Sequence, residues 1–145
     1  MSMDLNTRLN RLTRQLNANQ LNQISANEWL LLTADGLALQ ITRTGTGMVV
    51  LACCPDDLEL DPRWVPLLLS YNGLLTSTGG VVMGLTGNQR FVMQLPVTGA
   101  DDDTLASLTH NFLQLVREWQ QRLAQPCQAA TLALHLMTMM SAIKG

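Results

Sequence analysis

The sequence is poor in charge and in the side chains on which most enzymes depend. Of its 145 residues only 14% are charged, and there are just two histidines and three cysteines. The net charge of −2 contains no basic excess, so we do not expect nucleic acid as a partner. Because 47% of the residues are hydrophobic, a chain of this length can bury a core as about one domain without disulfides.

Long apolar runs are also missing. No stretch reaches the roughly 18 to 20 apolar residues of a membrane span. The first residues, MSMDLNTRLNRLTRQLN, lack the apolar core of a secretory signal. The adjacent Cys53 and Cys54 point to opposite faces of an expected strand, and the cysteine count is odd. We therefore expect reduced thiols, no membrane span and a cytoplasmic location.

Motifs for catalysis or metal binding are absent as well. His110 and His135 each fall on an expected helix, outside any ligand cluster. A thiol nucleophile at Cys53 or Cys54 is an alternative, but an apolar strand disfavours the thiolate. The carboxylates between residues 56 and 61 have no metal-ligand spacing and indicate a turn followed by a helix cap at Asp61. We expect no catalytic residue, metal or cofactor.

The apolar pattern predicts an α+β fold in which helices pack on an antiparallel sheet. Asp35-Gly36 predicts a hairpin, Asn17 to Ser25 reads as a polar loop, and Pro96 is expected to end strand pairing. The expected order is helix, three strands, helix, two strands, helix, with one extra C-terminal helix. The elements are a helix from Met3 to Asn17, strands at Glu28 to Thr33, Leu37 to Thr44 and Met48 to Cys54, a helix from about Pro66 to Leu75, strands at Val81 to Leu85 and Arg90 to Leu95, and helices from Asp103 to about Ala124 and from Ala129 to Ile143.

Two of the expected helices carry more apolar surface than one contact would bury. The segment from Asp61 to Leu75 is apolar on nearly every side, although a helix in a small domain normally needs one apolar stripe. We interpret the excess on this central helix as a contact for another protein chain. The helix from Ala129 to Ile143 is also too apolar for one contact, but at about 1.5 Å per residue it is too short to span a membrane.

The order of elements resembles the class I type III secretion chaperones of Gram-negative bacteria, the Tir chaperone family. The likeness is strongest from Leu67 to Leu85, LLLSYNGLLTSTGGVVMGL, where a leucine-rich helix containing Asn72 leads to a strand ending in Gly84-Leu85. An apolar strand ending at Leu95-Pro96 and the helix bearing Leu108, Phe112, Leu115 and Trp119 complete the pattern. The likeness covers roughly residues 3 to 124.

This resemblance implies a bacterial cytoplasmic homodimer that binds the N-terminal segment of a secreted effector, keeps it secretion-competent and presents it to the export ATPase. It also implies two sets of site residues, although for the effector set the sequence cannot separate an exposed patch from core. The dimer-interface candidates are Trp64, Leu68, Tyr71 and Leu75. The effector-binding candidates are Leu5, Leu9, Leu12, Leu39, Ile41, Val82 and Phe91.

Two features depart from the family pattern. Members are often more acidic than −2, and a minimal member would not have an apolar tail after Pro126. We therefore divide the chain into a secretion-chaperone-like domain at residues 1–125 and an apolar helical extension at 126–145. A protein-interaction or regulatory module of the same fold, with no role in secretion, is the alternative function.

Overall fold

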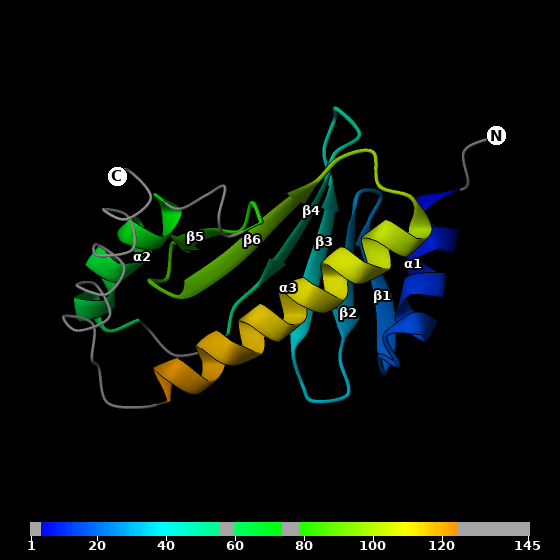
Figure 1. The fold of residues 1–145 in the computed structure, drawn as a ribbon. Helices are drawn as coiled ribbons and strands as arrows, with labels where there is room; N and C mark the ends of the chain where they lie inside the picture. Colours follow the sequence, from blue (N-terminus) through cyan, green and yellow to red (C-terminus); the bar gives the residue numbers. More distant parts are fainter. Residues whose placement is uncertain (1–3, 56–59, 74–78, 125–145) are drawn as a thin grey trace.

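The structure is a computed structural model that describes residues 4–55, 60–73 and 79–124 (Figure 1). Within these ranges the chain forms helices and strands in an order that begins and ends with a long helix. The elements are α1 (Leu5–Gln15), β1 (Gln20–Ser25), β2 (Glu28–Leu32), β3 (Ala38–Arg43), β4 (Val49–Cys53), the 3-10 turn η1 (Pro62–Trp64), α2 (Val65–Asn72), β5 (Val82–Leu85), β6 (Phe91–Val97) and α3 (Asp102–Leu123).

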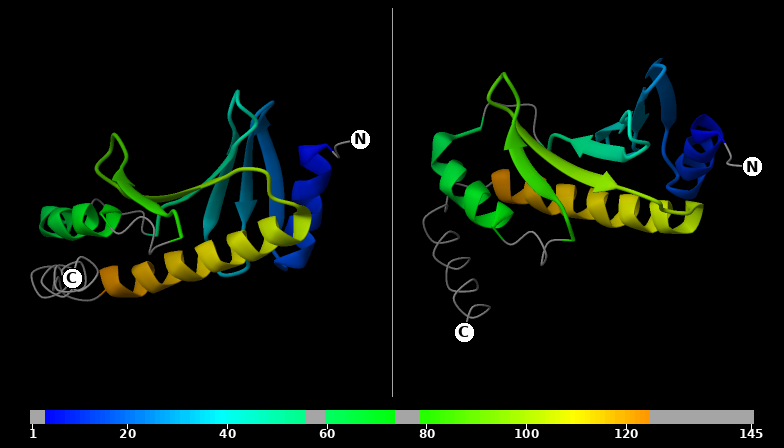
Figure 2. Two further views of the ribbon diagram at one scale, coloured as in Figure 1. Left: turned by 45° about the horizontal axis from the view of Figure 1, so that its top comes forward. Right: turned by 90° about the horizontal axis from the view of Figure 1, so that it is seen from above.

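The strands form one sheet in the order β1-β2-β3-β4-β6-β5, and every neighbouring pair is antiparallel. Helices α1 and α3 lie side by side on one face of this sheet, and α2 lies beside β5 at the far end of α3 (Figure 2). The α+β fold class expected from the sequence is confirmed.

Alternation along the strands separates a buried face from an open one. In β6, Phe91, Met93 and Leu95 point into the core beneath α3, whereas Val92 and Gln94 point away from it. The same alternation in β3 buries Leu39 and Ile41. Because side chains in a strand point alternately to the two faces, the sheet has one face packed under helices and one face lined by half-buried and exposed side chains.

Helix α3 begins with a side-chain cap, one residue before the predicted start at Asp103. The Asp101 carboxylate accepts a hydrogen bond from the Thr104 backbone N–H, and Asp102 and Asp103 occupy the first turn, where negative charge complements the helix dipole. One stripe of the helix packs on the sheet. Its buried residues are Leu105, Thr109, Phe112, Leu113, Val116 and Trp119.

A separate single turn precedes the central helix. Asp61 accepts a hydrogen bond from the Arg63 backbone N–H and caps the single turn η1. Helix α2 then begins at Val65, with Pro66 in its first turn, where the missing proline N–H breaks no helical hydrogen bond. The sequence predicted this helix from about Pro66 to Leu75. Helix α2 ends at Asn72, and residues 74 and 75 lie outside the described part of the chain.

The expected loop from Asn17 to Ser25 was wrong, because Gln20–Ser25 is the edge strand β1. Five of its six residues are exposed, so it has no alternation of apolar and polar side chains to reveal it. Backbone hydrogen bonds to β2 hold it in place, with a bulge between Gln23 and Ser25. The sheet therefore has one more strand than the sequence indicated.

The expectation that Pro96 ends strand pairing was also wrong. Pro96 lies opposite Val50 of β4, and β6 continues to Val97. Strand β5 pairs with β6 only as far as Gln94, so no described β5 residue lies opposite Pro96. In an antiparallel sheet, successive residues of a strand direct their backbone N–H and C=O groups to the neighbouring strands in turn. At Pro96 these groups face the β5 side of β6, which β5 does not reach, so the missing N–H breaks no hydrogen bond between strands.

The predicted helix at Ala129 to Ile143 lies outside the described residues.

Candidate partner-binding surfaces

The residues considered for chemistry do not form a reactive site. Cys53 is buried, Cys54 is half-buried, and His110 is exposed on α3. Within residues 4–55, 60–73 and 79–124, no group of three or more His, Cys, Asp or Glu side chains is placed to hold a metal ion. His135 lies outside these ranges.

Six of the seven effector-binding candidates lie in the core of the monomer. Each is at most 7% exposed, and only Val82 on β5 is half-buried. Of the two roles that the sequence left open for them, the structure gives these six the core role. Their apolar surface packs α1 and α3 against the sheet. The six residues are Leu5, Leu9, Leu12, Leu39, Ile41 and Phe91.

The dimer-interface candidates are likewise turned inward. Trp64 and Leu68 are buried, Tyr71 is half-buried, and Leu75 lies outside the described residues. The outer side of the helix carries a different set, which sequence reasoning missed. Its exposed members follow at intervals of four, three and four residues, and Leu69 is 66% exposed. This outer stripe consists of Pro62, Pro66, Leu69 and Gly73.

An aromatic cluster explains why Trp64 faces inward. The Trp119 ring of α3 meets the rings of Trp64, Tyr71 and Phe91 edge to face, with centroid distances of 6.3, 5.8 and 5.5 Å. Burial raises the pKa of the Tyr71 hydroxyl. Trp119 is 1% exposed, and its Nε1–H has no hydrogen-bond acceptor among the described residues. The cluster fixes α2 on α3, at the cost of one buried donor.

At one edge of the sheet, a side chain occupies the place of a neighbouring strand. The Asn72 Nδ2 donates to the Met83 carbonyl at 2.9 Å, and the Met83 N–H donates to Asn72 Oδ1 at 2.8 Å. Met83 is inside β5, whose other side pairs with β6. Its two outward backbone groups are therefore satisfied by the last residue of α2.

At the opposite edge, the backbone of β1 faces outward without such a cover. The Thr33 N–H bonds to the Leu37 carbonyl, so the alternate residues Leu31 and Trp29 of β2 direct their backbone groups to β3. By alternation Leu30 bonds to Asn22 of β1, and the backbone groups of Leu21 and Gln23 point away from β2. Among the described residues no hydrogen bond to these outward groups is found. This edge is a template for one more strand.

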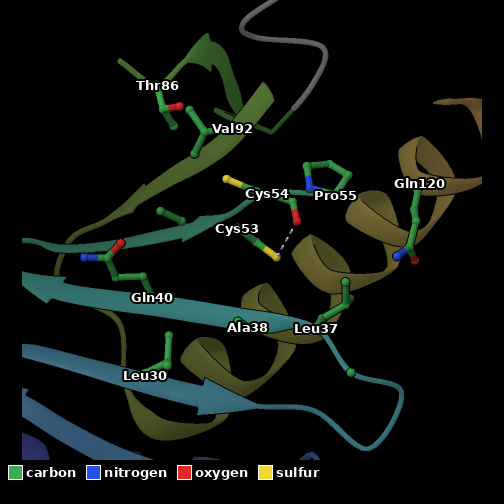
Figure 3. Close-up of a pocket in the computed structure, with 12 residues that line it drawn as sticks. Leu30, Leu37, Ala38, Gln40, Cys53, Cys54, Pro55, Thr86, Val92 and Gln120 are labelled. Carbon is green, nitrogen blue, oxygen red and sulfur yellow. Dashed lines mark hydrogen bonds between the residues drawn. The ribbon is translucent and has the colours of Figure 1, made fainter. Parts of the chain in front are cut away.

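The open face of the sheet has a shallow groove of about 570 Å³ (Figure 3). Leu30, Ala38 and Ala52 lie on adjacent strands along it, and Val92 of β6 and Cys54 line its other side. None of the described residues that line the groove is charged, and the small alanines allow close approach of a backbone.

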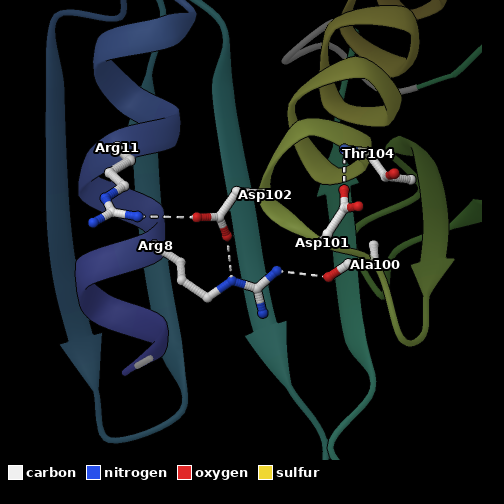
Figure 4. A network of polar contacts seen from close by, with 6 residues as sticks. All are labelled: Arg8, Arg11, Ala100, Asp101, Asp102 and Thr104. Atoms are coloured by element: carbon white, nitrogen blue, oxygen red, sulfur yellow. Dashed lines mark hydrogen bonds and ion pairs between the residues drawn. The ribbon is translucent and has the colours of Figure 1, made fainter. Parts of the chain in front are cut away.

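The arginines of α1 are engaged within the molecule (Figure 4). Arg8 Nε donates to Asp102 at 2.6 Å, its Nη2 donates to the Ala100 carbonyl at 2.6 Å, and Arg11 bonds to the same carboxylate at 3.3 Å. The hydrogen bond from Arg8 lowers the pKa of Asp102. The basic stripe of α1 thus ties that helix to the start of α3, and Arg11 and Arg14 are its exposed members.

A second ion pair ties the hairpin between β2 and β3 to α3. Arg117 donates to both carboxylate oxygens of Asp35, at 2.6 and 3.1 Å, and Thr33 donates to Asp35 at 2.6 Å. The hydrogen bond from Arg117 is the main reason that the pKa of Asp35 lies well below its usual range.

None of the described helices is long and apolar enough to cross a membrane.

The model of the Tir chaperone protein (CesT) family matches residues 6–120 of the chain. The match covers most of the sequence, so the chain belongs to this family of type III secretion chaperones, as the sequence pattern suggested. No curated protein matches the chain.

Two solved structures share the fold. A chain from the structure of the HopA1-SchA chaperone-effector complex is 16% identical, with a TM-score of 0.62, over 83% of this chain and 99% of that one. YbjN, a putative transcription regulator from E. coli, is 14% identical, with a TM-score of 0.55, over 84% of this chain and 93% of its own. At these identities the likeness is one of fold.

Proposed function

We propose that the protein binds the N-terminal segment of a secreted effector as a homodimer and keeps that segment competent for export. The observation that carries this proposal is the outward backbone of β1, which offers main-chain hydrogen bonds to an extended chain. Membership of the Tir chaperone protein family supports the class of partner. Pairing of the effector backbone with β1 would hold the segment in an extended form, so the segment would stay unfolded for export.

Main-chain recognition also fits the chemistry around this edge. The side chains of β1 are uncharged and mostly polar, and none of the described residues that line the groove on the neighbouring open face is charged. Binding by β1 would therefore depend little on ionic strength and would tolerate several effector sequences. The six core-facing effector candidates would contribute by packing the helices and the sheet together, and Val82 would lie on β5, at the other end of the sheet from β1.

For the homodimer we propose the outer stripe of Pro62, Pro66, Leu69 and Gly73 as the contact. It is apolar, exposed and rigid at its two prolines, so little conformational entropy is lost when it is covered. Trp64, Leu68 and Tyr71 then support α2 from within. We further propose a cytoplasmic location and presentation of the bound segment to the export ATPase.

The test is co-expression of the chain with N-terminal fragments of the proteins encoded beside it. We expect a complex of two chaperone chains with a fragment that becomes resistant to limited proteolysis, measured by light scattering and mass spectrometry. A chain that protects no such fragment would contradict the proposal. It would instead favour a regulatory module of the same fold, the kind of protein suggested for YbjN by its description.

A further inference from the structure

The edge strand β5 lies beside the end of α2, and the contact between them has the form of a strand pairing. In the antiparallel pair of β5 and β6, the Thr86 N–H bonds to the Arg90 carbonyl. Counting back from that bond, the backbone groups of Met83 face away from β6. These are the two groups that the Asn72 side chain binds, at 2.8 and 2.9 Å.

An asparagine side chain can do this because its amide carries a carbonyl oxygen and an N–H side by side, as a peptide unit does. The Asn72 amide does not cap its own helix, because its nitrogen and its oxygen both bond to the Met83 backbone. Its two hydrogen bonds go to a strand eleven residues further along the chain. The side chain therefore stands where the backbone of an additional strand would pair.

We infer that Asn72 closes the β5 edge at Met83 and so directs any incoming strand to β1. The inference rests on the proposed function only for the identity of that strand. An exposed edge strand is a template for unwanted pairing, and natural sheets cover such edges or interrupt them. Here the cover is one amide, held by α2, and the aromatic cluster around Trp119 holds α2 in turn.

To bind both outward groups of Met83, the side chain at position 72 must carry a hydrogen-bond donor and an acceptor side by side. Alanine at position 72 would leave both outward groups of Met83 without a partner. Aspartate would still accept from the Met83 N–H, but it would lose the donor and set a carboxylate oxygen against the Met83 carbonyl. When the aspartate is protonated at low pH it regains a donor, so the Asn72→Asp variant carries a signature that simple loss of packing would not produce.

The experiment is hydrogen exchange of individual backbone amides in the full chain, followed by NMR. In the unsubstituted protein we expect the Met83 amide to exchange at least about tenfold more slowly than the outward amide of Gln23. Equal exchange at these two positions would overturn the inference without any variant being made. No effector is needed, so failure here is distinguishable from failure of the proposed function.

The variant arm uses Asn72→Ala, with Ser70→Ala as its matched control. Ser70 lies on the same helix and its hydroxyl donates to the Pro66 carbonyl, away from β5. We expect Asn72→Ala to speed exchange at Met83 at least about tenfold and to promote strand-mediated self-association, detected as an intermolecular amide I band. Ser70→Ala should do neither. Slow exchange at Met83 in Asn72→Ala would overturn the inference.

The Asn72→Asp variant supplies the second readout. We expect its Tm to lie below that of the unsubstituted protein at neutral pH, and the difference to narrow as the pH falls through the titration of the carboxyl group. A constant difference over that range would overturn the assignment of the Asn72 donor to the Met83 carbonyl.

Discussion

The two edges of the sheet differ in almost every physical respect. Strand β1 is polar, mostly exposed and flanked by amide side chains, and the backbone of Leu21 and Gln23 faces outward. Strand β5 is short and apolar, and Asn72 satisfies the outward groups of Met83. One edge is left able to accept a strand, while the other is covered by part of its own chain.

The difference shows how one sheet can be both soluble and receptive. Exposed apolar strands aggregate, so the apolar edge is the one that is covered. The polar edge can stay open because its side chains are well solvated and do not attract a second copy. In the proposed homodimer, the two copies meet instead at the outer stripe of α2, which lies next to the covered edge. Breaking each of these features should affect one end of the sheet more than the other.

The largest effect is expected at the aromatic cluster. Trp119→Ala removes the ring that Trp64, Tyr71 and Phe91 contact, and should lower the free energy of unfolding by about 3–5 kcal/mol, measured in urea. Trp119→Phe keeps a ring and removes the donor that has no described acceptor, so it should cost much less. Equal losses for the two variants would mean that the ring does not hold the covered edge.

Self-association should respond next. Leu69→Asp places a charge in the outer stripe and should raise the dimer Kd at least about 100-fold, or about 2.7 kcal/mol, while stability changes within about 0.5 kcal/mol. Analytical ultracentrifugation measures both species. Ile24→Asp is the matched control, because Ile24 is 58% exposed but lies on β1. A dimer weakened equally by both substitutions would not be held by the stripe.

Proline substitutions test the open edge at adjacent positions. Asn22→Pro removes an N–H that bonds to β2 and should cost about 1–3 kcal/mol in urea unfolding. Gln23→Pro removes an outward N–H and should cost clearly less, yet it should weaken binding of an effector fragment. If Gln23→Pro destabilises the chain as much as Asn22→Pro, the outward assignment is incorrect.

The smallest effect concerns the ion pair between Asp35 and Arg117. The pKa of Asp35 is lower in the folded protein than in the unfolded chain, so its stabilisation is present above about pH 4 and is lost as the pH falls below that value. The pair is partly exposed, so it should contribute less than about 1 kcal/mol. Asp35→Asn should flatten the fall of Tm with acid; an unchanged slope would show that other groups cause it.

Much of the fold was predictable because its signals are local. The apolar residues Leu108, Phe112, Leu115 and Trp119, spaced three and four apart, predicted α3, and Asp35-Gly36 predicted its hairpin, where Gly36 has a φ of 91°. Strand β1 was missed because its place comes from backbone bonds to β2 and its side chains show no alternation. No signal in its sequence distinguishes this strand from a polar loop.

The candidate surfaces were harder to predict for a different reason. A helix that is apolar all round does not reveal which side is buried, so the sequence could not show that Trp64 and Leu68 pack inward in the monomer. The orientation of α2 depends on contacts with elements far along the chain, the Trp119 ring of α3 and the backbone of β5. The role of Asn72 depends on a strand that follows a turn, and the family pattern marked that residue without giving a physical reason.

The most direct test compares the two edges in a complex. Backbone amide exchange would be measured in the full chain with and without the N-terminal fragment of a secreted protein that it protects from proteolysis. We predict that the amides of Leu21 and Gln23 become strongly protected when the fragment binds, while Met83 keeps the exchange rate of the free chain. New protection at Met83, with Leu21 and Gln23 unchanged, would contradict the assignment of β1 as the edge that receives the partner.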